Sequence, residues 1–284
     1  MTSYIASLEA GGWGMRKRFT AAVIALLFIP TPAGADTSAS VFLEDFTSAE
    51  LGSKLTSSCP VLLVFSGGTE ATGPHVALGK HNFRVRAYGE AIARNLENAV
   101  VAPVLPFAPN DPELQRFPGT ITLDESTFSR VNEEVVRSLL ATGFRRVALL
   151  SDHFGSQEPL RKLAARLDVE YALKGPRVFY VSDGYLKARQ QIEAKLNRAG
   201  HVSGGHGGLW DTAETMAVRP SAVRSGEFHP GTLTNNGNAP IDARGVSGDP
   251  RGASAALGRR FGQLRVRLAS DELRTLLRSA GPCR

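Results

Sequence analysis

Several features that are common in proteins are scarce in this 284-residue sequence, and each scarcity narrows what the chain can be. Only two cysteines are present, Cys59 and Cys283, and neither stands in a CxxC or other zinc-type spacing. No block of lysine and arginine with interleaved aromatic residues occurs, which argues against nucleic-acid binding. No predicted strand is followed by a GxGxxG or P-loop motif, which argues against a nucleotide-binding α/β protein.

Long apolar runs are also missing, and the run nearest the N-terminus is short. Phe19–Ile29 follows the basic segment Met15–Arg18 and precedes Ala33–Ala35, a small-residue cleavage pattern. This arrangement predicts a signal peptide, with translation starting at Met15 and Asp36 as the mature N-terminus. The run is too short to span a bilayer comfortably, so a stable membrane anchor is the less favoured interpretation. We therefore expect a periplasmic or secreted protein.

Composition and charge describe an ordinary globular protein. Hydrophobic residues make up 42% and charged residues 21% of the chain, which is enough to form a sizeable core. The formal net charge is +6, of which residues 1–35 carry +2, so the mature chain is only mildly basic. In an oxidising compartment Cys59 and Cys283 either form a disulfide or remain free thiols, because the sequence gives no distance between them.

Strand and helix patterns alternate along the mature chain. Short apolar runs predict strands at 61–65, 99–105, 146–150 and 178–181, and helical spacing predicts helices at 82–98, 127–142, 158–167, 185–199 and 253–279. Such alternation is typical of a mainly parallel sheet with helices on both faces. We expect an α/β fold, a three-layer α/β/α sandwich, with residues 36–284 forming a single domain.

Residues that can carry chemistry lie behind predicted strands or just ahead of a helix, mostly in glycine-rich loops. They are Glu70, His75, His81, His153, His206 and Asp211. Loops at the carboxyl ends of parallel strands meet at one edge of a sheet, where ligands bind. Imidazole and carboxylate groups are ligands of zinc, manganese and related ions, which activate water for amide hydrolysis. The alternative is a set of histidines that cap helices or fill polar pockets.

Five short segments match one family pattern in order along the mature chain. They are Gly68–His81, Phe117–Thr120, Gly143–Gln157, His206–Ala213 and Gly245–Gly258. The first is similar to G-[ST]-x-E-Q-H-G-P-H-L-P-L-x-T-D and the fourth to H-A-G-x-x-E-T-S, and the chain thereby resembles the creatininase (creatinine amidohydrolase) family. The resemblance implies hydrolysis of cyclic amides, formamides or peptide ends, and assembly as a homo-oligomer such as a hexamer.

The departures from the family pattern concern the metal ligands. In the family, the first loop supplies Glu, His and a bridging Asp to a pair of divalent ions. Here the Glu is kept as Glu70, but the His position is Thr72 and the bridging Asp position is His81. A carboxylate that some members use for the second ion falls on Gly155. One ion, zinc or manganese, is therefore favoured over two, and its expected ligands are Glu70, His81 and the retained His153.

The remaining candidates receive supporting roles by the same resemblance. His75 is a further candidate ligand, and His206 stands where the family places a proton donor for the leaving nitrogen, a role that suits an ordinary imidazole pKa. Asp211 would orient that nitrogen or the water, and Asp152 is a second candidate base. We predict a metal-dependent amidohydrolase that acts on a small-molecule amide or a peptide through a metal-activated water. The alternative is a non-catalytic exported binding or scaffold protein with a degenerate metal site.

Overall fold

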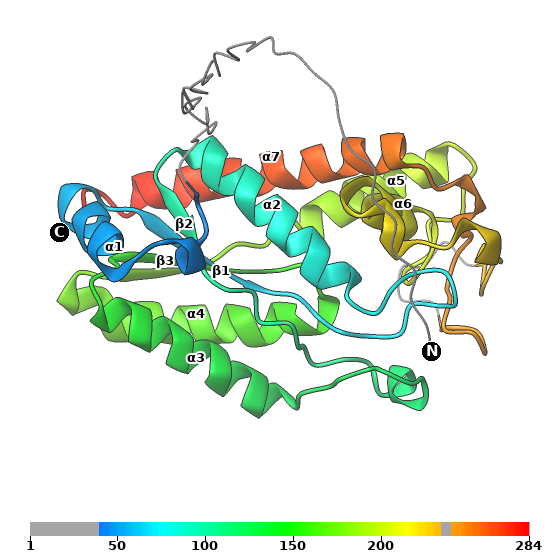
Figure 1. The fold of residues 1–284 in the computed structure, drawn as a ribbon, viewed down its shortest axis with the longest axis horizontal. Coiled ribbons are helices and arrows are strands. Elements are labelled where there is room, and N and C mark those ends of the chain that lie inside the picture. The colour runs from blue at the N-terminus through cyan, green and yellow to red at the C-terminus, as the bar shows by residue number, and fades with distance from the viewer. Residues whose placement is uncertain (1–39, 234–239, 284) are drawn as a thin grey trace, which may run out of the picture. The chain divides into compact units, whose positions relative to one another are not determined.

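Short runs of buried apolar residues form a four-stranded sheet in the computed structural model, which describes residues 40–233 and 240–283 (Figure 1). The strands are β1 (Val61–Ser66), β2 (Ala99–Val101), β3 (Arg146–Ser151) and β4 (Arg177–Tyr180). They are ordered β2-β1-β3-β4, and every pairing is parallel. In the central pair, Ser66 of β1 is in register with Ser151 of β3, so both strands end at the same level. The loops that follow them consequently start side by side.

Seven α-helices in the described part of the chain pack around the sheet. They are α1 (Ser48–Ser57), α2 (Lys80–Leu96), α3 (Glu125–Ala141), α4 (Gln157–Tyr171), α5 (Leu186–Arg198), α6 (Leu209–Val218) and α7 (Ala255–Ser279). Helices α2 and α7 lie on one face of the sheet, and α3 and α4 lie on the other (Figure 1). The predicted three-layer α/β/α arrangement around a parallel sheet is confirmed.

Side chains of β1 alternate between two cores. Leu62 and Val64 pack with apolar side chains of α3 and α4, whereas Leu63 and Phe65 pack with those of α2 and α7. Because both faces are covered, the strand is apolar at successive positions instead of at every second one. Each such side chain, when fully buried, stabilises the fold by about 1.5–3 kcal/mol. The sheet is therefore a rigid base for the loops at its carboxyl edge.

Two helix starts place candidate residues in the first turn of a helix. Helix α2 begins at Lys80 behind Gly79, two residues before the predicted start at residue 82, so His81 lies in the first helical turn and not in a loop. The Asn82 side chain instead accepts a hydrogen bond from the backbone N–H of Gly68 at 3.0 Å. Helix α6 begins at Leu209, which brings Asp211 into its first turn. Both residues are thereby fixed by helical backbone.

The predictions for residues 1–35, namely the start at Met15 and the signal-peptide cleavage, lie outside the described residues. The described residues all belong to one compact unit. None of the helices found among them is long and apolar enough to cross a membrane.

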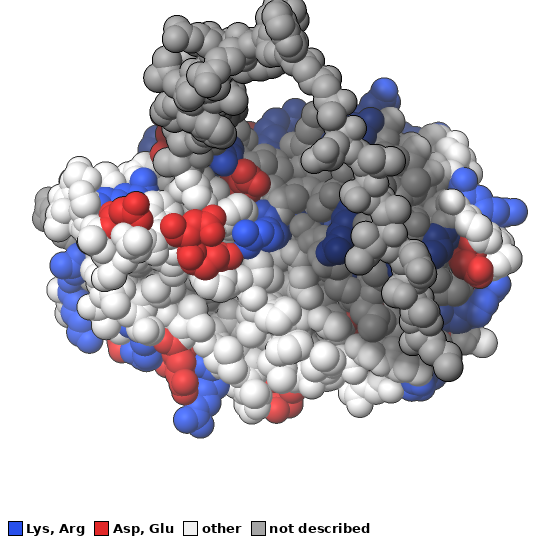
Figure 2. Space-filling model, viewed as in Figure 1, with Lys and Arg blue, Asp and Glu red and all other residues white. Residues whose placement is uncertain are grey.

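On the face shown in Figure 2, acidic and basic side chains are interspersed. Many of the exposed charges are paired, as in Arg161 with Glu158 and Arg166 with Glu133. Exposed pairs of this kind contribute only about 0–1 kcal/mol each, so the surface charges do little to hold the fold.

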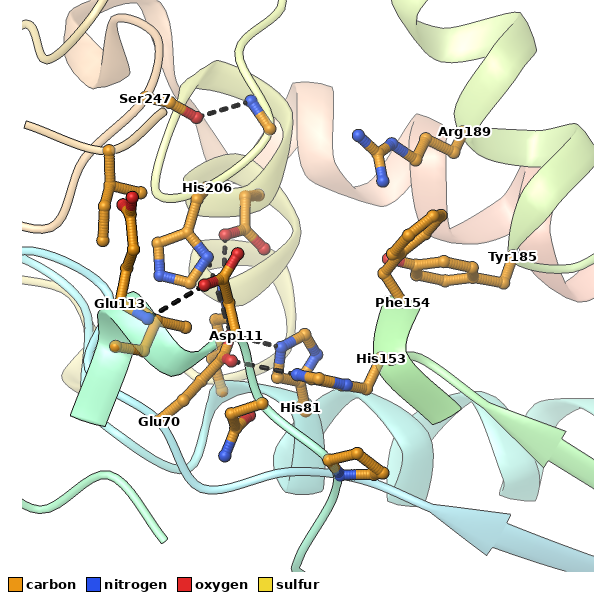
Figure 3. A pocket seen from close by; sticks show the side chains of 18 of the residues that line it. Glu70, His81, Asp111, Glu113, His153, Phe154, Tyr185, Arg189, His206 and Ser247 are labelled. Carbon is orange, nitrogen blue, oxygen red and sulfur yellow. Dashed lines mark hydrogen bonds and ion pairs between the residues drawn. The ribbon is translucent and has the colours of Figure 1, made fainter. Parts of the chain in front are cut away.

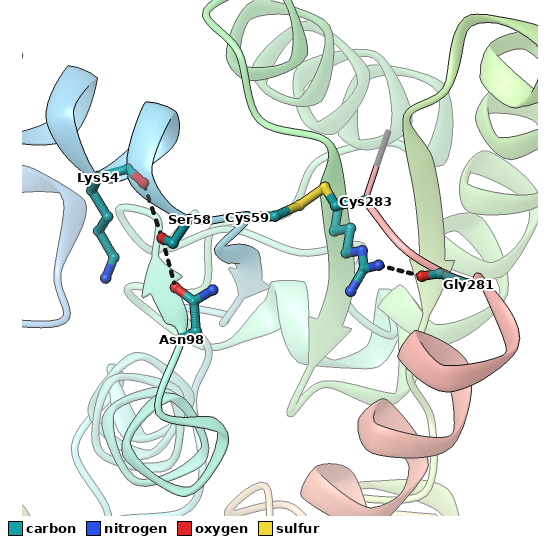
Figure 4. The surroundings of a disulfide bond; sticks show 7 residues. Lys54, Ser58, Cys59, Asn98, Gly281 and Cys283 are labelled. Atoms are coloured by element: carbon teal, nitrogen blue, oxygen red, sulfur yellow. Dashed lines mark hydrogen bonds between the residues drawn. A yellow bond between two sulfur atoms is a disulfide. The ribbon is translucent and has the colours of Figure 1, made fainter.

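Of the two alternatives for the cysteines, the structure has the disulfide. Cys59, directly ahead of β1, is bonded to Cys283 behind α7, with a Cα–Cα distance of 6.3 Å (Figure 4). The bond closes a loop with a sequence separation of 224 residues. It therefore ties the end of the chain to the start of the central sheet.

The double substitution Cys59→Ser and Cys283→Ser should lower the free energy of unfolding by about 3–5 kcal/mol, because a long closed loop restricts the unfolded chain most. Equilibrium denaturation with guanidinium chloride under non-oxidising conditions measures the effect. Wild-type protein reduced with dithiothreitol is the control and should match the double variant. A loss below about 1 kcal/mol would show that the bond restrains only the local chain end.

Candidate metal centre

Three side chains that are able to bind a metal meet behind the ends of β1 and β3. Glu70 comes from the loop after β1, His81 from the first turn of α2, and His153 from the segment after β3 (Figure 3). Glu70 Oε1 lies 2.8 Å from His81 Nε2, and Glu70 Oε2 lies 3.0 Å from His153 Nε2. All three residues are buried. The register of the two central strands brings these distant positions together.

The donor set fits a divalent ion. One ligand atom from each of the three residues lies within 4.8 Å of the others, the one group of this kind among the described residues. Both ring nitrogens of His81 face carboxylate oxygens, since Nδ1 is 2.9 Å from Asp152 Oδ2. A neutral imidazole has only one N–H and can satisfy only one of them. An ion at Nε2 leaves that proton on Nδ1 for Asp152, the usual arrangement of a metal-binding histidine.

The three residues line a pocket of about 540 Å³. Its described lining also includes the acidic residue Glu113 and the aromatic residues Phe154 and Tyr185. Figure 3 shows Glu113 across the pocket from the two aromatic rings. A cavity of this size admits a small amide or the end of a peptide.

His206 also lines the pocket, and its protonation differs from the prediction. Its Nε2 lies 2.7 Å from the carbonyl oxygen of Ala71, which can only accept, so the ring carries its proton on Nε2. Nδ1 is 3.7 Å from Glu70 Oε1. Burial, aided by the charge of Lys80, lowers the pKa of His206 to about 4, in place of the ordinary value expected. The ring is therefore neutral at neutral pH, and Nδ1 is the nitrogen that is able to accept a proton.

Asp152 lies behind His81. It is not among the described residues that line the pocket. Its carboxylate accepts hydrogen bonds from His81 and from Arg84 Nε at 2.7 Å. Burial pushes the pKa of Asp152 upward, but Arg84, the hydrogen bond from His81 and Arg265 together outweigh burial and hold this pKa well below its usual range. These contacts suit the positioning of His81, and the role of Asp152 as a base stays a prediction.

Asp211 is similarly occupied by cations. Its Oδ2 accepts from Lys80 Nζ at 2.6 Å and from the Gly207 N–H at 2.8 Å, and its Oδ1 accepts from Arg84 Nη1 at 2.6 Å. Burial alone would raise the pKa of Asp211, but Lys80 and Arg84 reverse the shift and lower it strongly. The carboxylate thus holds Lys80 and the glycine-rich loop in place.

His75 does not join the metal-ligand group, so the prediction that it is a ligand is wrong. Its Nε2 donates to the carbonyl oxygen of Gly207 at 2.9 Å, and its ring packs edge-on against Phe228. Gly207 has a φ of +64°, a left-handed conformation that favours glycine. His75 therefore fastens the glycine-rich loop ahead of α6.

Sequence reasoning missed a group of buried charged residues beside the ligands. They are Lys80, Arg84, Glu214 and Arg265. Arg84 pairs with Asp152, Asp211 and Glu214, and Arg265 pairs with Glu214 and Asp152. Once α2 begins at Lys80, the helical spacing places Lys80 and Arg84 on the same face, four residues apart. A correct helix start would have revealed this part of the network.

Comparison with known proteins gives consistent matches. The family model described as creatininase, creatinine amidohydrolase, matches residues 44–273. The mycofactocin precursor peptide peptidase of Mycobacterium ulcerans (strain Agy99) is 26% identical over 228 residues, covering 74% of this chain and 82% of the relative. The creatinine amidohydrolase of Pseudomonas putida is 24% identical over 255 residues, covering 84% and 97%. A solved structure named "Creatininase Mn" has a TM-score of 0.71 at 21% identity, covers 86% of this chain and 100% of its own, and shows the shared fold.

Proposed function

This chain belongs to the creatininase family, and we propose that it is a metal-dependent hydrolase that cleaves the C–N bond of an amide, a cyclic amide or a peptide. The observation that carries the proposal is the meeting of Glu70, His81 and His153 at one pocket. Relatives named creatinine amidohydrolase and peptide peptidase support hydrolysis as the reaction class.

The residues around the centre have different roles in such a reaction. A divalent ion held by Glu70, His81 and His153 would supply Lewis acidity, which acidifies water and polarises a carbonyl group. His206 accepts the proton of the attacking water at Nδ1 and passes it to the departing nitrogen. The Ala71 carbonyl keeps the ring in the tautomer that this transfer needs.

We infer that the centre takes one ion, zinc or manganese. A Cβ atom at Gly155 would lie 2.1 Å from the carbonyl oxygen of Pro109, so a carboxylate side chain does not fit at this position without a backbone shift. Thr72 is fully buried, and its hydroxyl is directed to the Glu70 carbonyl oxygen at 3.5 Å. Neither position therefore offers the ligand that the family pattern places there for a second ion.

Metal analysis tests the proposal. Protein produced with zinc and manganese in the medium should contain about one equivalent of divalent metal by mass spectrometry, since catalytic ions are tightly held. Treatment with a chelator should lower hydrolysis at least about a hundredfold, and one equivalent of metal should restore it. The assay uses a panel of cyclic amides, formamides and peptides. Less than about a tenth of an equivalent would favour a binding or scaffold protein with the same fold.

We also propose that the mature protein is periplasmic or secreted. The Cys59–Cys283 disulfide supports this location, because such bonds persist in oxidising compartments. Intact mass of the exported protein should correspond to a chain that begins at Asp36. Its native mass tests the homo-oligomer implied by the family resemblance.

A further inference from the structure

Lys80 is a buried cation beside Glu70, His81 and His153. The proposed reaction assigns it no role. It is 1% exposed, and lysine is almost never buried to this extent unless it is paired. Its Nζ lies 2.6 Å from Asp211 Oδ2 and 3.2 Å from Glu70 Oε1. The ammonium therefore stands between a candidate metal ligand and a second carboxylate.

The groups around this ammonium are themselves of the kind that bind a metal. Two carboxylates contact it, and His206 Nδ1 approaches the same Glu70 oxygen at 3.7 Å. Carboxylate oxygen and imidazole nitrogen are ordinary ligands of divalent ions. A lysine ammonium is a compact point charge, so it occupies the place that a second ion would otherwise share with these groups.

The balance of buried charge agrees with this arrangement. The buried acids of the cluster are Glu70, Asp152, Asp211 and Glu214, and its buried bases are Lys80, Arg84 and Arg265. With neutral histidines the cluster has a net charge of −1, which one divalent ion changes to +1. A second divalent ion would leave a charge of +3 in a desolvated site, where uncompensated charge is costly.

We propose that Lys80 is a built-in second cation of this centre. Its ammonium limits the centre to one divalent ion and weakens the binding of that ion by repulsion across Glu70. The inference rests on the proposed metal function. Lys80 is thus a positioning residue that sets how many ions bind and how tightly.

Metal binding by matched variants tests the role of Lys80. Wild-type protein should bind one zinc ion. Lys80→Met should bind that ion at least about tenfold more tightly, because a like charge a few ångströms away is gone, and should accept a second equivalent. The double variant Lys80→Met with Asp211→Asn restores the net charge and should return to one equivalent. The surface variant Lys187→Met, which removes an exposed pair with Asp183, should behave as wild type.

The readouts are metal content after dialysis and competition with a chromophoric chelator, neither of which requires a substrate. A Lys80→Met protein with one equivalent at unchanged affinity would overturn the inference and leave the proposed hydrolase intact. A wild-type protein that binds no metal would instead overturn the proposed function itself. Electron paramagnetic resonance of wild-type protein with excess manganese gives a result even if the variants do not fold. An isolated-ion spectrum is expected, and a spin-coupled pair would refute the role of Lys80.

Discussion

Replacement of His153 by alanine should remove the proposed metal ion, and with it the proposed hydrolase activity, while the fold remains intact. His153 provides one of three protein donors to the proposed ion. Zinc held by four ligands in small domains contributes about 10–16 kcal/mol, so the loss of one donor should weaken binding by roughly 3–4 kcal/mol, or about 10²–10³-fold. We expect little bound metal after dialysis. We also expect the rate of hydrolysis to fall by at least the same factor as the metal affinity. Metal content and the rate on the best substrate of the panel measure both effects.

His201→Ala is the matched control for this experiment. His201 is exposed and follows α5, so its removal should change neither metal content nor rate. Circular dichroism and thermal unfolding of both variants establish that the fold is retained. If His153→Ala kept a full equivalent of tightly bound metal, the ion would have to bind elsewhere, and the ligand assignment would be wrong.

The fold was predictable because its signals are local. Val61–Phe65 is apolar at successive positions, which is typical of a parallel strand covered on both faces, and each such run is followed by a helical pattern. The group of Glu70, His81 and His153 follows from the same logic, since residues behind adjacent parallel strands meet at one edge.

The charged network could not be predicted, because its contacts join distant parts of the chain. Lys80 and Asp211 are 131 residues apart, and Arg84 and Asp152 are 68 apart. Their meeting depends on how α2 packs against α6 and β3, which no local pattern encodes. The predicted helix start at residue 82 hid the relevant spacing as well, because glycine at the true N-cap carries no side chain that marks a helix start.

The roles of the acids and histidines were harder to predict than their presence. Asp152 and His75 have the right chemistry for a base and a ligand, but burial and partners decide what each does. Asp152 is held ionised by Arg84 behind His81, and His75 donates its proton to a loop carbonyl. Residue type alone predicts which groups can act, while the environment selects those that do.

Replacement of Arg84 by methionine should cause the largest loss of stability of any single change considered. Arg84 is fully buried and lies 2.6 Å from both Asp152 and Asp211 and 3.5 Å from Glu214. Removing one partner of a buried charge network leaves the others uncompensated and costs about 3–5 kcal/mol. For a domain of this size that corresponds to a fall in Tm of roughly 6–20 °C. Chemical denaturation at neutral pH measures the free energy of unfolding directly.

Arg86→Met is the natural comparison, because Arg86 lies two residues away from Arg84 on α2. Its guanidinium is exposed and pairs with Glu44 at 2.7 Å, so its loss should cost no more than about 1 kcal/mol. The Arg84→Met deficit should also shrink below about pH 4. Arg84 lowers the pKa of Asp152 and Asp211, and stability gained from a lowered carboxylate pKa disappears as acid protonates the folded protein. Equal costs for the two arginine variants would mean that helix packing, and not charge compensation, holds the candidate metal ligands in position.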